Sequence, residues 1–355
     1  MARRFLFAHE DFKSAGWSDE LHQLGAQGLA VGEGYGRRLR CLLPGLWGRR
    51  GADVYVFRYL NDWSSLPRSI ALLGRDAFTL LVCWVTGVRV LWIMHNVDRE
   101  THAWHPGISR LRRAMVARFA RRVLVADPWL QEAALARGIP RERLGWVCFG
   151  APQWPVVDAR NEALARQIRE FRARLTQRAR RVVLGLAVSD DARKKTHYLN
   201  VPDTVGVTDD GTVVAMLLIG RYPPGDEFKH ARTRAYESEY LQVLDEAIAV
   251  NERFLAPLFD FFYRSMNDLS VPFTAYVAGS LEKPLITRAQ GALSRIVERE
   301  QLGGVLREQD PAPPQIVAMV DQFRADGCRR FLDRRSWKRG ARALLEAAYS
   351  DGEPE

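Results

Sequence analysis

The chain has 355 residues, a length that suggests two domains. With 47% hydrophobic and 26% charged residues, its composition is that of a folded soluble protein and excludes a disordered or fibrous chain. The 52 lysines and arginines exceed the 42 acidic residues, giving a net charge of +10. This excess suits nucleic acid, nucleotide diphosphates or an anionic membrane, without selecting among them. The four cysteines form no C-x-x-C pair, which excludes a zinc ribbon and fits a reducing cytosol.

The first 150 residues alternate between strand-like and helix-like segments. Continuously apolar runs, typical of strands buried on both faces of a parallel sheet, occupy 3–9, 53–60, 88–96, 122–127 and 144–150. Helix-like segments occupy 64–86, 108–121 and 128–137. The alternation predicts a doubly wound α/β domain. The apolar stretch 77–94 is interrupted by Gly87 and Arg89, so we expect a buried helix followed by a buried strand, not a membrane span.

The second half of the chain is less regular. A basic amphipathic helix follows two Pro-containing turns and predicts a linker over 153–180. Strands are expected at 181–188 and 212–220, with a hairpin turn at Asp210-Gly211. A helical tract over 231–264 and a further strand over 271–280 should follow. The expected domains are therefore 1–152, a linker helix over 153–180, 181–335, and a closing helix and tail over 336–355.

The segment 88–106 carries the most chemistry. Its apolar strand ends in His95 and Asn96, and the polar loop that follows contains Asp98, Glu100 and His102. In open parallel sheets, ligands bind beyond the carboxyl ends of the strands, so these side chains are candidate site residues. The alternative is that the loop merely caps the next helix. Zinc binding by Glu100, His102 and His105 is disfavoured, because the spacing is not helical and no fourth ligand is near.

The motifs of 88–152 resemble those of a known family. A strand ending in His-Asn, a loop with Glu and His, an Arg-rich helix, the strand RVLVAD and the segment LARGIPRERLGWVCFGAP are similar to the acceptor-binding domain of GT-B glycosyltransferases, especially the GT4-type and exopolysaccharide enzymes. The resemblance implies two Rossmann-like domains that face a cleft, the second one diverged. It also implies a nucleotide-diphosphate sugar as co-substrate, with no cofactor. Gly16 and Trp17 then fall where the family places a cleft-facing glycine loop on the acceptor side, together with Asn96 and His102.

The second domain matches the family in part. TVVAMLLIGRYPPGDEFKH is similar to the strand and donor loop whose basic residue faces the diphosphate, which assigns Gly220, Arg221 and Lys229 to donor binding. VPFTAYVAGS is similar to a later strand of the family, which adds Gly279 and Glu282. The family's donor segment with two glutamates eight residues apart is missing. The acidic pairs at 190–191 and 209–210 do not follow a nucleotide-binding strand, as they would in a GT-A enzyme.

These features predict a metal-independent, cytoplasmic glycosyltransferase. Helix N-termini and basic side chains would neutralise the departing diphosphate. An inverting enzyme would also need a base, for which His95, Asp98 and Glu100 are the candidates. The basic helix 110–122 places Arg110, Arg113 and Arg121 largely away from its apolar residues. This basic face is either solvated or contacts an anionic membrane at the inner face, where a lipid-linked acceptor would lie. The acceptor itself stays open: a saccharide, a lipid-linked sugar or a small molecule.

Two other functions remain open. The missing glutamate pair favours a non-catalytic, transferase-like activator or binding partner. Charge alone would allow a nucleic-acid-binding protein, although no helix-turn-helix, zinc-finger or RNP-like motif supports one.

Overall fold

The computed structural model describes residues 2–30, 34–43, 51–98, 103–189, 195–223, 225–244 and 250–350. The chain divides into two compact units. The first unit contains Met1–Gly150 together with Asp268–Val271 and Arg335–Glu355, and the second contains Ala151–Asn267 and Pro272–Arg334. The closing segment of the chain therefore belongs to the first unit.

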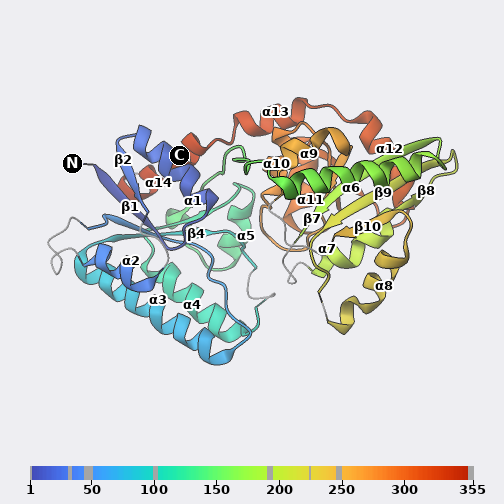
Figure 1. The fold of residues 1–355 in the computed structure, drawn as a ribbon. Helices are drawn as coiled ribbons and strands as arrows, with labels where there is room; N and C mark the ends of the chain where they lie inside the picture. The colour runs from blue at the N-terminus through green and yellow to red at the C-terminus, as the bar shows by residue number, and fades with distance from the viewer. Residues whose placement is uncertain are drawn as a thin grey trace. The chain divides into compact units, whose positions relative to one another are not determined.

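The first unit is built on a parallel sheet of order β2-β1-β3-β4-β5-β6 (Figure 1). Its strands are β1 (Arg3–Phe7), β2 (Ala26–Leu29), β3 (Val54–Phe57), β4 (Arg89–Met94), β5 (Arg122–Val125) and β6 (Leu144–Trp146). The side chains of β3 are all buried, as are those of β4 after Arg89. This burial on both faces explains their continuous apolar runs and confirms the five strands predicted in this half.

Helices cover both faces of this sheet. Figure 1 shows α2 (Tyr35–Leu42), α3 (Leu66–Thr86) and α4 (Pro106–Phe119) on one face, and α1 (Phe12–Gln23) with α14 (Trp337–Tyr349) on the other. The short helix α5 (Leu130–Ala136) connects β5 to β6. Right-handed crossovers, the general rule for parallel strands, would give this distribution, because the chain moves one way from β1 to β2 and the opposite way from β2 to β6.

The exposure of α3 and α4 differs from the sequence-based expectation. The Gly87 break is correct, since Gly87 ends α3 in the left-handed conformation. The helix was expected to be buried, but one of its sides is not, because Phe78, Leu81 and Trp84 are about half exposed or more. On α4, Arg113 was expected to face solvent but is only 6% exposed, whereas Leu111 is 56% exposed. Arg113 is buried because its guanidinium donates hydrogen bonds to main-chain carbonyls at the end of β4.

The second unit repeats the architecture with the strand order β10-β9-β7-β11-β12-β13. Its parallel strands are β7 (Arg181–Val188), β9 (Thr212–Ile219), β10 (Leu241–Leu244), β11 (Phe261–Tyr263), β12 (Leu285–Arg288) and β13 (Gly303–Leu306). The two-residue strand β8 (Gly206–Val207) pairs with β9 in antiparallel fashion, which confirms the hairpin turn at Asp210-Gly211. The helices are α6 (Ala159–Thr176), α7 (Lys195–Asn200), α8 (Lys229–Glu237), α9 (Glu252–Leu255), α10 (Thr274–Ser280), α11 (Gly291–Glu300), α12 (Ala312–Gln322) and α13 (Asp326–Asp333).

Two predictions in this half are wrong. The tract 231–264 is not one helix, because α8 ends at Glu237 and the strands β10 and β11 follow. The expected strand 271–280 contains α10 instead, which packs against α13 through an edge-on contact between Tyr276 and Phe331. Five successive residues of α10 are buried, and a short helix buried on all sides has the same apolar run as a buried strand. The helix expected as a linker, α6, belongs to the second unit and buries Leu164, Ile168 and Phe171.

The contact between α1 and α14 depends on glycine. A Cβ atom added to Gly16 would lie 2.6 Å from the Trp337 ring, and one added to Gly150 would lie 2.3 Å from the same ring. Trp17 packs edge-on against Trp337, and its indole N–H donates a hydrogen bond of 3.0 Å to the Cys148 carbonyl. The closing helix is therefore held on the first sheet by close aromatic packing that leaves no room for side chains at Gly16 and Gly150.

Replacement of Gly16 by Ala tests this packing. We expect Gly16→Ala to lower the free energy of unfolding by about 1–3 kcal/mol, because the added methyl group overpacks the Trp337 contact. Gly74→Ala is the matched control, since Gly74 is also helical but has no atom within 4 Å of its Cβ position. Gly74→Ala should stabilise the protein by about 0.5–1 kcal/mol through helix propensity. Urea unfolding of both variants makes the comparison, and equal stabilities would contradict the packing argument.

Candidate functional site

Each sheet has one position where consecutive connections leave in opposite directions. In the first unit this switch point lies between β1 and β3, and in the second between β7 and β11. The loops that follow these strands separate there and leave a crevice, where ligands of doubly wound folds bind. The side chains that follow β1, β3, β7 and β11 are therefore the first candidates for a binding site.

The switch point of the first unit holds a buried ion pair. Arg58 follows β3 and is fully buried, while Asp11 follows β1 and caps the N-terminus of α1. The two Nη atoms of Arg58 donate to the two carboxylate oxygens of Asp11 at 2.6 and 3.1 Å. Tyr59 joins them, since its hydroxyl accepts from Arg58 and donates to Asp11. A buried guanidinium requires such partners, so the pair fixes the loops after β1 and β3 against each other.

His95, at the end of β4, is held between two aromatic rings. Its imidazole stacks on Tyr59 with centroids 4.4 Å apart, and on Phe149 with centroids 5.7 Å apart. Lys13, from the first turn of α1, places its ammonium 4.7 Å from the centre of the Phe149 ring. Stacking on Tyr59 and Phe149 fixes the plane of the imidazole, and its ring nitrogens remain available for hydrogen bonds at its edges.

The hydrogen bonds and charges around His95 determine its chemistry. Arg58 donates from Nε to Nε2 of His95 at 3.3 Å, so the proton of the neutral imidazole is on Nδ1. Burial, together with the positive charges of Arg58 and Lys13, holds the pKa of His95 well below its usual value. A neutral imidazole whose Nε2 already accepts a hydrogen bond is a poor proton acceptor. The geometry therefore supports His95 as a hydrogen-bond donor through Nδ1 and argues against its predicted role as general base.

Two neighbours complete this region, which we call the His95 cluster (His9, Asp11, Arg58, Tyr59 and His95). Burial and the nearby charges of Arg38 and Arg58 lower the pKa of His9 to about 4. Burial raises the pKa of Asp11, but the hydrogen bonds and the charge of Arg58 lower it by more. The net pKa is below the usual value, so the carboxyl stays ionised at neutral pH. The cluster thus contains one carboxylate, one guanidinium and two neutral imidazoles, and the Lys13 ammonium lies next to it.

Asn96 and Asp98 have structural partners. The Asp98 carboxylate accepts the main-chain N–H of Leu269 at 2.9 Å, and the Asn96 amide donates to Asp268 at 3.3 Å. Both residues hold the segment Asp268–Val271 on the first unit. Asp98 is 9% exposed, which disfavours it as the base. Glu100 and His102 lie outside the described residues.

Gly16 and Trp17 do not lie in a cleft-facing loop. Both are inside α1, which begins at Phe12, and both are buried against α14. The predicted loop position is wrong because Asp11 and Ser14 form a capping box that starts the helix directly after His9 and Glu10.

The corresponding edge of the second unit has one position that only glycine can occupy. Gly220 follows β9 with φ of +135°, and a Cβ atom there would lie 1.6 Å from the Ser189 carbonyl oxygen. This close approach places Arg221, which is exposed, at the carboxyl edge beside the end of β7. Lys229 is exposed on the first turn of α8, which follows the same loop. The structure therefore brings Gly220, Arg221 and Lys229 to one edge of the sheet.

Arg264 lies at the switch point of this unit and was not among the residues expected from the sequence. Arg264 follows β11, is 8% exposed, and donates from Nη1 to the Val188 carbonyl at the end of β7. Its neighbour Ser265 accepts a hydrogen bond from Asn200 on α7. The signal was present, since Arg264 directly follows the aromatic residues Phe261–Tyr263, but the long helix expected over 231–264 concealed this strand.

Gly279 and Glu282 are not part of this edge. Gly279 is buried in α10, and Glu282 comes shortly before β12, at the amino edge of the sheet. The Glu282 carboxylate forms a two-pronged ion pair with Arg329, which lowers its pKa. They were expected at the carboxyl edge of the sheet as donor-binding residues. They do not lie there, because the segment predicted as their strand is the helix α10.

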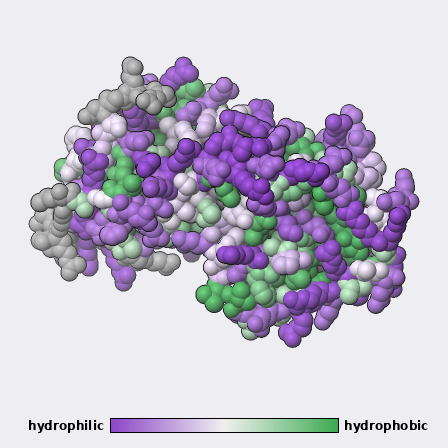
Figure 2. Space-filling model, turned by 90° about the horizontal axis from the view of Figure 1, so that it is seen from above, coloured by the Kyte–Doolittle hydropathy of each residue, from purple (hydrophilic) through white to green (hydrophobic). Residues whose placement is uncertain are grey.

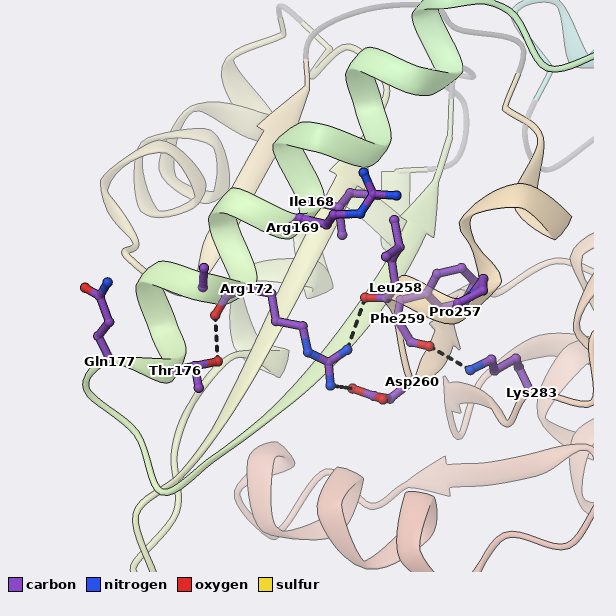
Figure 3. Close-up of a pocket in the computed structure, with 11 residues that line it drawn as sticks. Ile168, Arg169, Arg172, Thr176, Gln177, Pro257, Leu258, Phe259, Asp260 and Lys283 are labelled. Carbon is purple, nitrogen blue, oxygen red and sulfur yellow. Dashed lines mark hydrogen bonds and ion pairs between the residues drawn. The ribbon is translucent and has the colours of Figure 1, made fainter.

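A pocket of the second unit also lies at the amino edge of the sheet. It has a volume of about 610 Å³ and is lined by α6 and by the segments before β11 and β12 (Figure 3). Arg172 contacts the Leu258 carbonyl and Asp260, and Lys283 donates to the Phe259 carbonyl. These cations brace the chain, and the pocket is at the opposite edge from Gly220. We therefore assign it a structural role.

No metal centre emerges from the residues that the structure describes, among which no group of three or more His, Cys, Asp or Glu side chains could hold an ion.

Comparison with known proteins defines the class of fold. No family model and no curated protein matches the sequence. Solved structures match over nearly the whole chain, and they show that this protein has the GT-B glycosyltransferase fold of two Rossmann-like domains.

Three of these structures illustrate the range of activities on this fold. Sucrose-phosphate synthase from Thermosynechococcus elongatus has a TM-score of 0.63 and 13% identity, over 97% of this chain and 98% of its own. Anabaena HepE in complex with UDP-glucose has a TM-score of 0.61 and 12% identity, over 97% and 99%. UDP-GlcNAc 2-epimerase from Methanocaldococcus jannaschii has a TM-score of 0.52 and 12% identity, over 99% and 100%. At such identities the likeness establishes the fold and leaves the reaction to be argued from the site.

The low pKa of His9 predicts an acid-sensitive fold. The unfolded chain takes up a proton on His9 below about pH 6.5, whereas the folded protein does so only near pH 4. The free energy of unfolding should therefore fall between pH 6.5 and 4, and His9→Asn should reduce the slope by up to about 1.4 kcal/mol per pH unit. His22→Asn, at an exposed position of α1, is the control. Urea unfolding across this range measures the slopes, and identical slopes for wild type and His9→Asn would refute the assignment.

Proposed function

We propose that the protein is a glycosyltransferase that transfers a sugar from a nucleotide-diphosphate sugar to an acceptor hydroxyl. The observation that carries the proposal is the placement of charged and polar side chains at the carboxyl edges of both sheets in a GT-B fold. Solved proteins of the same fold were crystallised with UDP and with UDP-glucose. The fold alone does not decide the reaction, because a 2-epimerase shares it.

The second unit would bind the nucleotide diphosphate. In the reaction, the bond between the anomeric carbon and the diphosphate oxygen breaks, and its electron pair leaves with the diphosphate. Arg221 and Lys229 are exposed cations at the carboxyl edge, suited to stabilise this charge, and the backbone at Gly220 admits a close approach. This arrangement supports transfer without a metal ion, so EDTA should leave the rate unchanged.

The first unit would bind the acceptor. The acceptor oxygen forms the new bond to the anomeric carbon, and its proton passes to the departing diphosphate, whose oxygen has gained the electron pair of the broken bond. His95 would orient a substrate oxygen through Nδ1–H, since its ring is fixed between Tyr59 and Phe149. Lys13 and the Asp11–Arg58 pair supply fixed charges next to it.

We place the reaction in the cytoplasm. All four cysteines are free thiols, three of them buried, as expected in a reducing compartment. The acceptor class stays as broad as the sequence left it, namely a saccharide, a lipid-linked sugar or a small molecule.

A non-catalytic role is the second candidate, supported by the absence of the family's glutamate pair. A protein of that kind would bind the nucleotide at the same edge but would not turn over the sugar donor.

Nucleotide affinity tests the donor assignment. Replacing Arg221 or Lys229 by Ala removes one charge-assisted contact and should weaken binding of UDP, GDP or TDP, whichever stabilises the wild type in a thermal-shift screen, by about tenfold to a hundredfold. Arg169→Ala is the matched control, because Arg169 is exposed on α6 beside the pocket at the opposite sheet edge. Calorimetric titration gives the dissociation constants. Unchanged affinity in both variants would remove these residues from the donor site.

The pH profile tests the role of His95. If His95 donates a hydrogen bond, kcat/KM has no ionisation between pH 5.5 and 8 that depends on it, and His95→Ala lowers kcat by about tenfold to a hundredfold at every pH. His95→Gln, which keeps an N–H donor, should recover part of the loss. A wild-type ionisation in this range that disappears in His95→Gln would show that His95 is the general base after all.

A further inference from the structure

Helix α3 has an apolar face that no described residue of the first unit covers. Phe78, Leu81 and Val85 are 48%, 50% and 69% exposed, and Trp84 is 71% exposed. Together with Ile70, at 53%, they recur at helical spacing along one side of a 21-residue helix. From Ile70 to Val85, at 1.5 Å per residue, this side extends for about 22 Å. An apolar side of this length, exposed on a folded domain, marks an interaction surface.

The opposite side of α3 prevents the helix from crossing a membrane. By length and composition α3 could span a bilayer. Its inner side, however, packs in the first unit, where Thr79, Leu80 and Cys83 are buried. Asp76, also on that side, forms a buried two-pronged ion pair with Arg112 of α4, at 2.6 and 3.0 Å. Pulling α3 into a bilayer would break this pair, so the helix can only lie along an interface.

The apolar surface continues onto α4. Leu111 and Phe119 are 56% and 46% exposed, and Met115 lies between them at i+4 spacing. Figure 1 shows α3 and α4 side by side on one face of the first sheet. Figure 2 views this unit from the side of α1 and α14, where hydrophilic side chains predominate. The exposed apolar side chains of α3 and α4 are thus on the opposite face of the unit.

An arginine pocket adjoins this surface. Beside Leu111, Met115 and Phe119 on α4 lie residues 110, 114 and 118. These residues and the turn from Arg137 to Arg143 line a cavity of about 370 Å³. Its described lining contains five arginines (Arg110, Arg113, Arg118, Arg137 and Arg143) and no acidic residue. Two of them are fixed in place: Arg113 by the carbonyls of Asn96 and Val97, and Arg143 by the carbonyl of Arg118. Five arginines and no acidic residue among the described lining make this cavity positively charged, which suits phosphate.

We infer that the outer face of α3 and α4 docks on an anionic bilayer. The apolar side chains would enter the head-group boundary, Trp84 among them, and the arginine pocket would bind the phosphates of anionic lipids. Charge selects this occupant, because a phosphate-rich surface complements the pocket whereas a second copy of this chain, with net charge +10, would repel it. The inference goes beyond sugar transfer and does not depend on it.

Vesicle flotation tests the inference with the full-length protein. The wild type should bind vesicles of phosphatidylcholine with 30% phosphatidylglycerol at least tenfold better than vesicles of phosphatidylcholine alone. Arg110→Ala with Arg118→Ala, both exposed positions of the pocket, should lose about tenfold of the binding to anionic vesicles. Leu81→Ser with Trp84→Ser should lose binding to both kinds of vesicle.

Matched controls separate docking from general loss of charge or apolar surface. Arg166→Ala with Arg169→Ala removes two exposed arginines of α6, and Val156→Ser changes a side chain that is 89% exposed in the second unit. Both controls should bind like the wild type, and melting curves should show all variants folded. The inference is overturned if the wild type stays unbound, if the controls lose as much binding as the test variants, or if Leu81→Ser with Trp84→Ser instead abolishes a dimer seen by analytical ultracentrifugation.

Discussion

The arrangement of the first unit depends on one buried cation. Arg58 has no exposed surface, and a guanidinium in that position costs several kcal/mol unless its N–H groups find acceptors. Asp11, the His9 carbonyl and His95 supply them, so one side chain ties together the segments after β1, β3 and β4. Burial first, and the charge of Arg58 in addition, lower the pKa of His9 and of His95, which keeps both imidazoles neutral. The electrostatics of the candidate acceptor site therefore follow from its burial together with the buried charge of Arg58.

The GT-B fold was predictable in the first half because its strands are buried on both faces. The strand Val54–Phe57 and residues 90–94 of β4 are apolar without alternation, a pattern typical of strands covered on both faces of a parallel sheet. His95 could be singled out because it ends such a run. Its partners Asp11 and Arg58 could not, because they are 47 positions apart in the sequence and meet only through the pairing of β1 with β3.

The second half shows where local pattern fails. The strand β11 has three residues, too few to display a period, and α10 is buried on all sides, so neither carries the signature of its own structure. Gly220 is the contrasting case. Its strand, β9, has eight buried residues that predict it clearly, and the glycine follows directly. The exposure of α3 was also predicted wrongly. Its apolar residues divide between a buried side and an exposed side, and which side is buried depends on how the helix packs on the folded sheet.

The central claim is that the carboxyl edge of the second sheet binds the nucleotide diphosphate, and hydrogen–deuterium exchange tests it most directly. With a saturating concentration of UDP, GDP or TDP, the amides of Gly220–Tyr222 and of the first turn of α8 should gain protection, because a bound nucleotide stabilises the segments that contact it. The amides of 257–260, beside the pocket at the opposite edge, should exchange as in the free protein. Protection confined to 257–260, or no protection with any of the three nucleotides, would contradict the account.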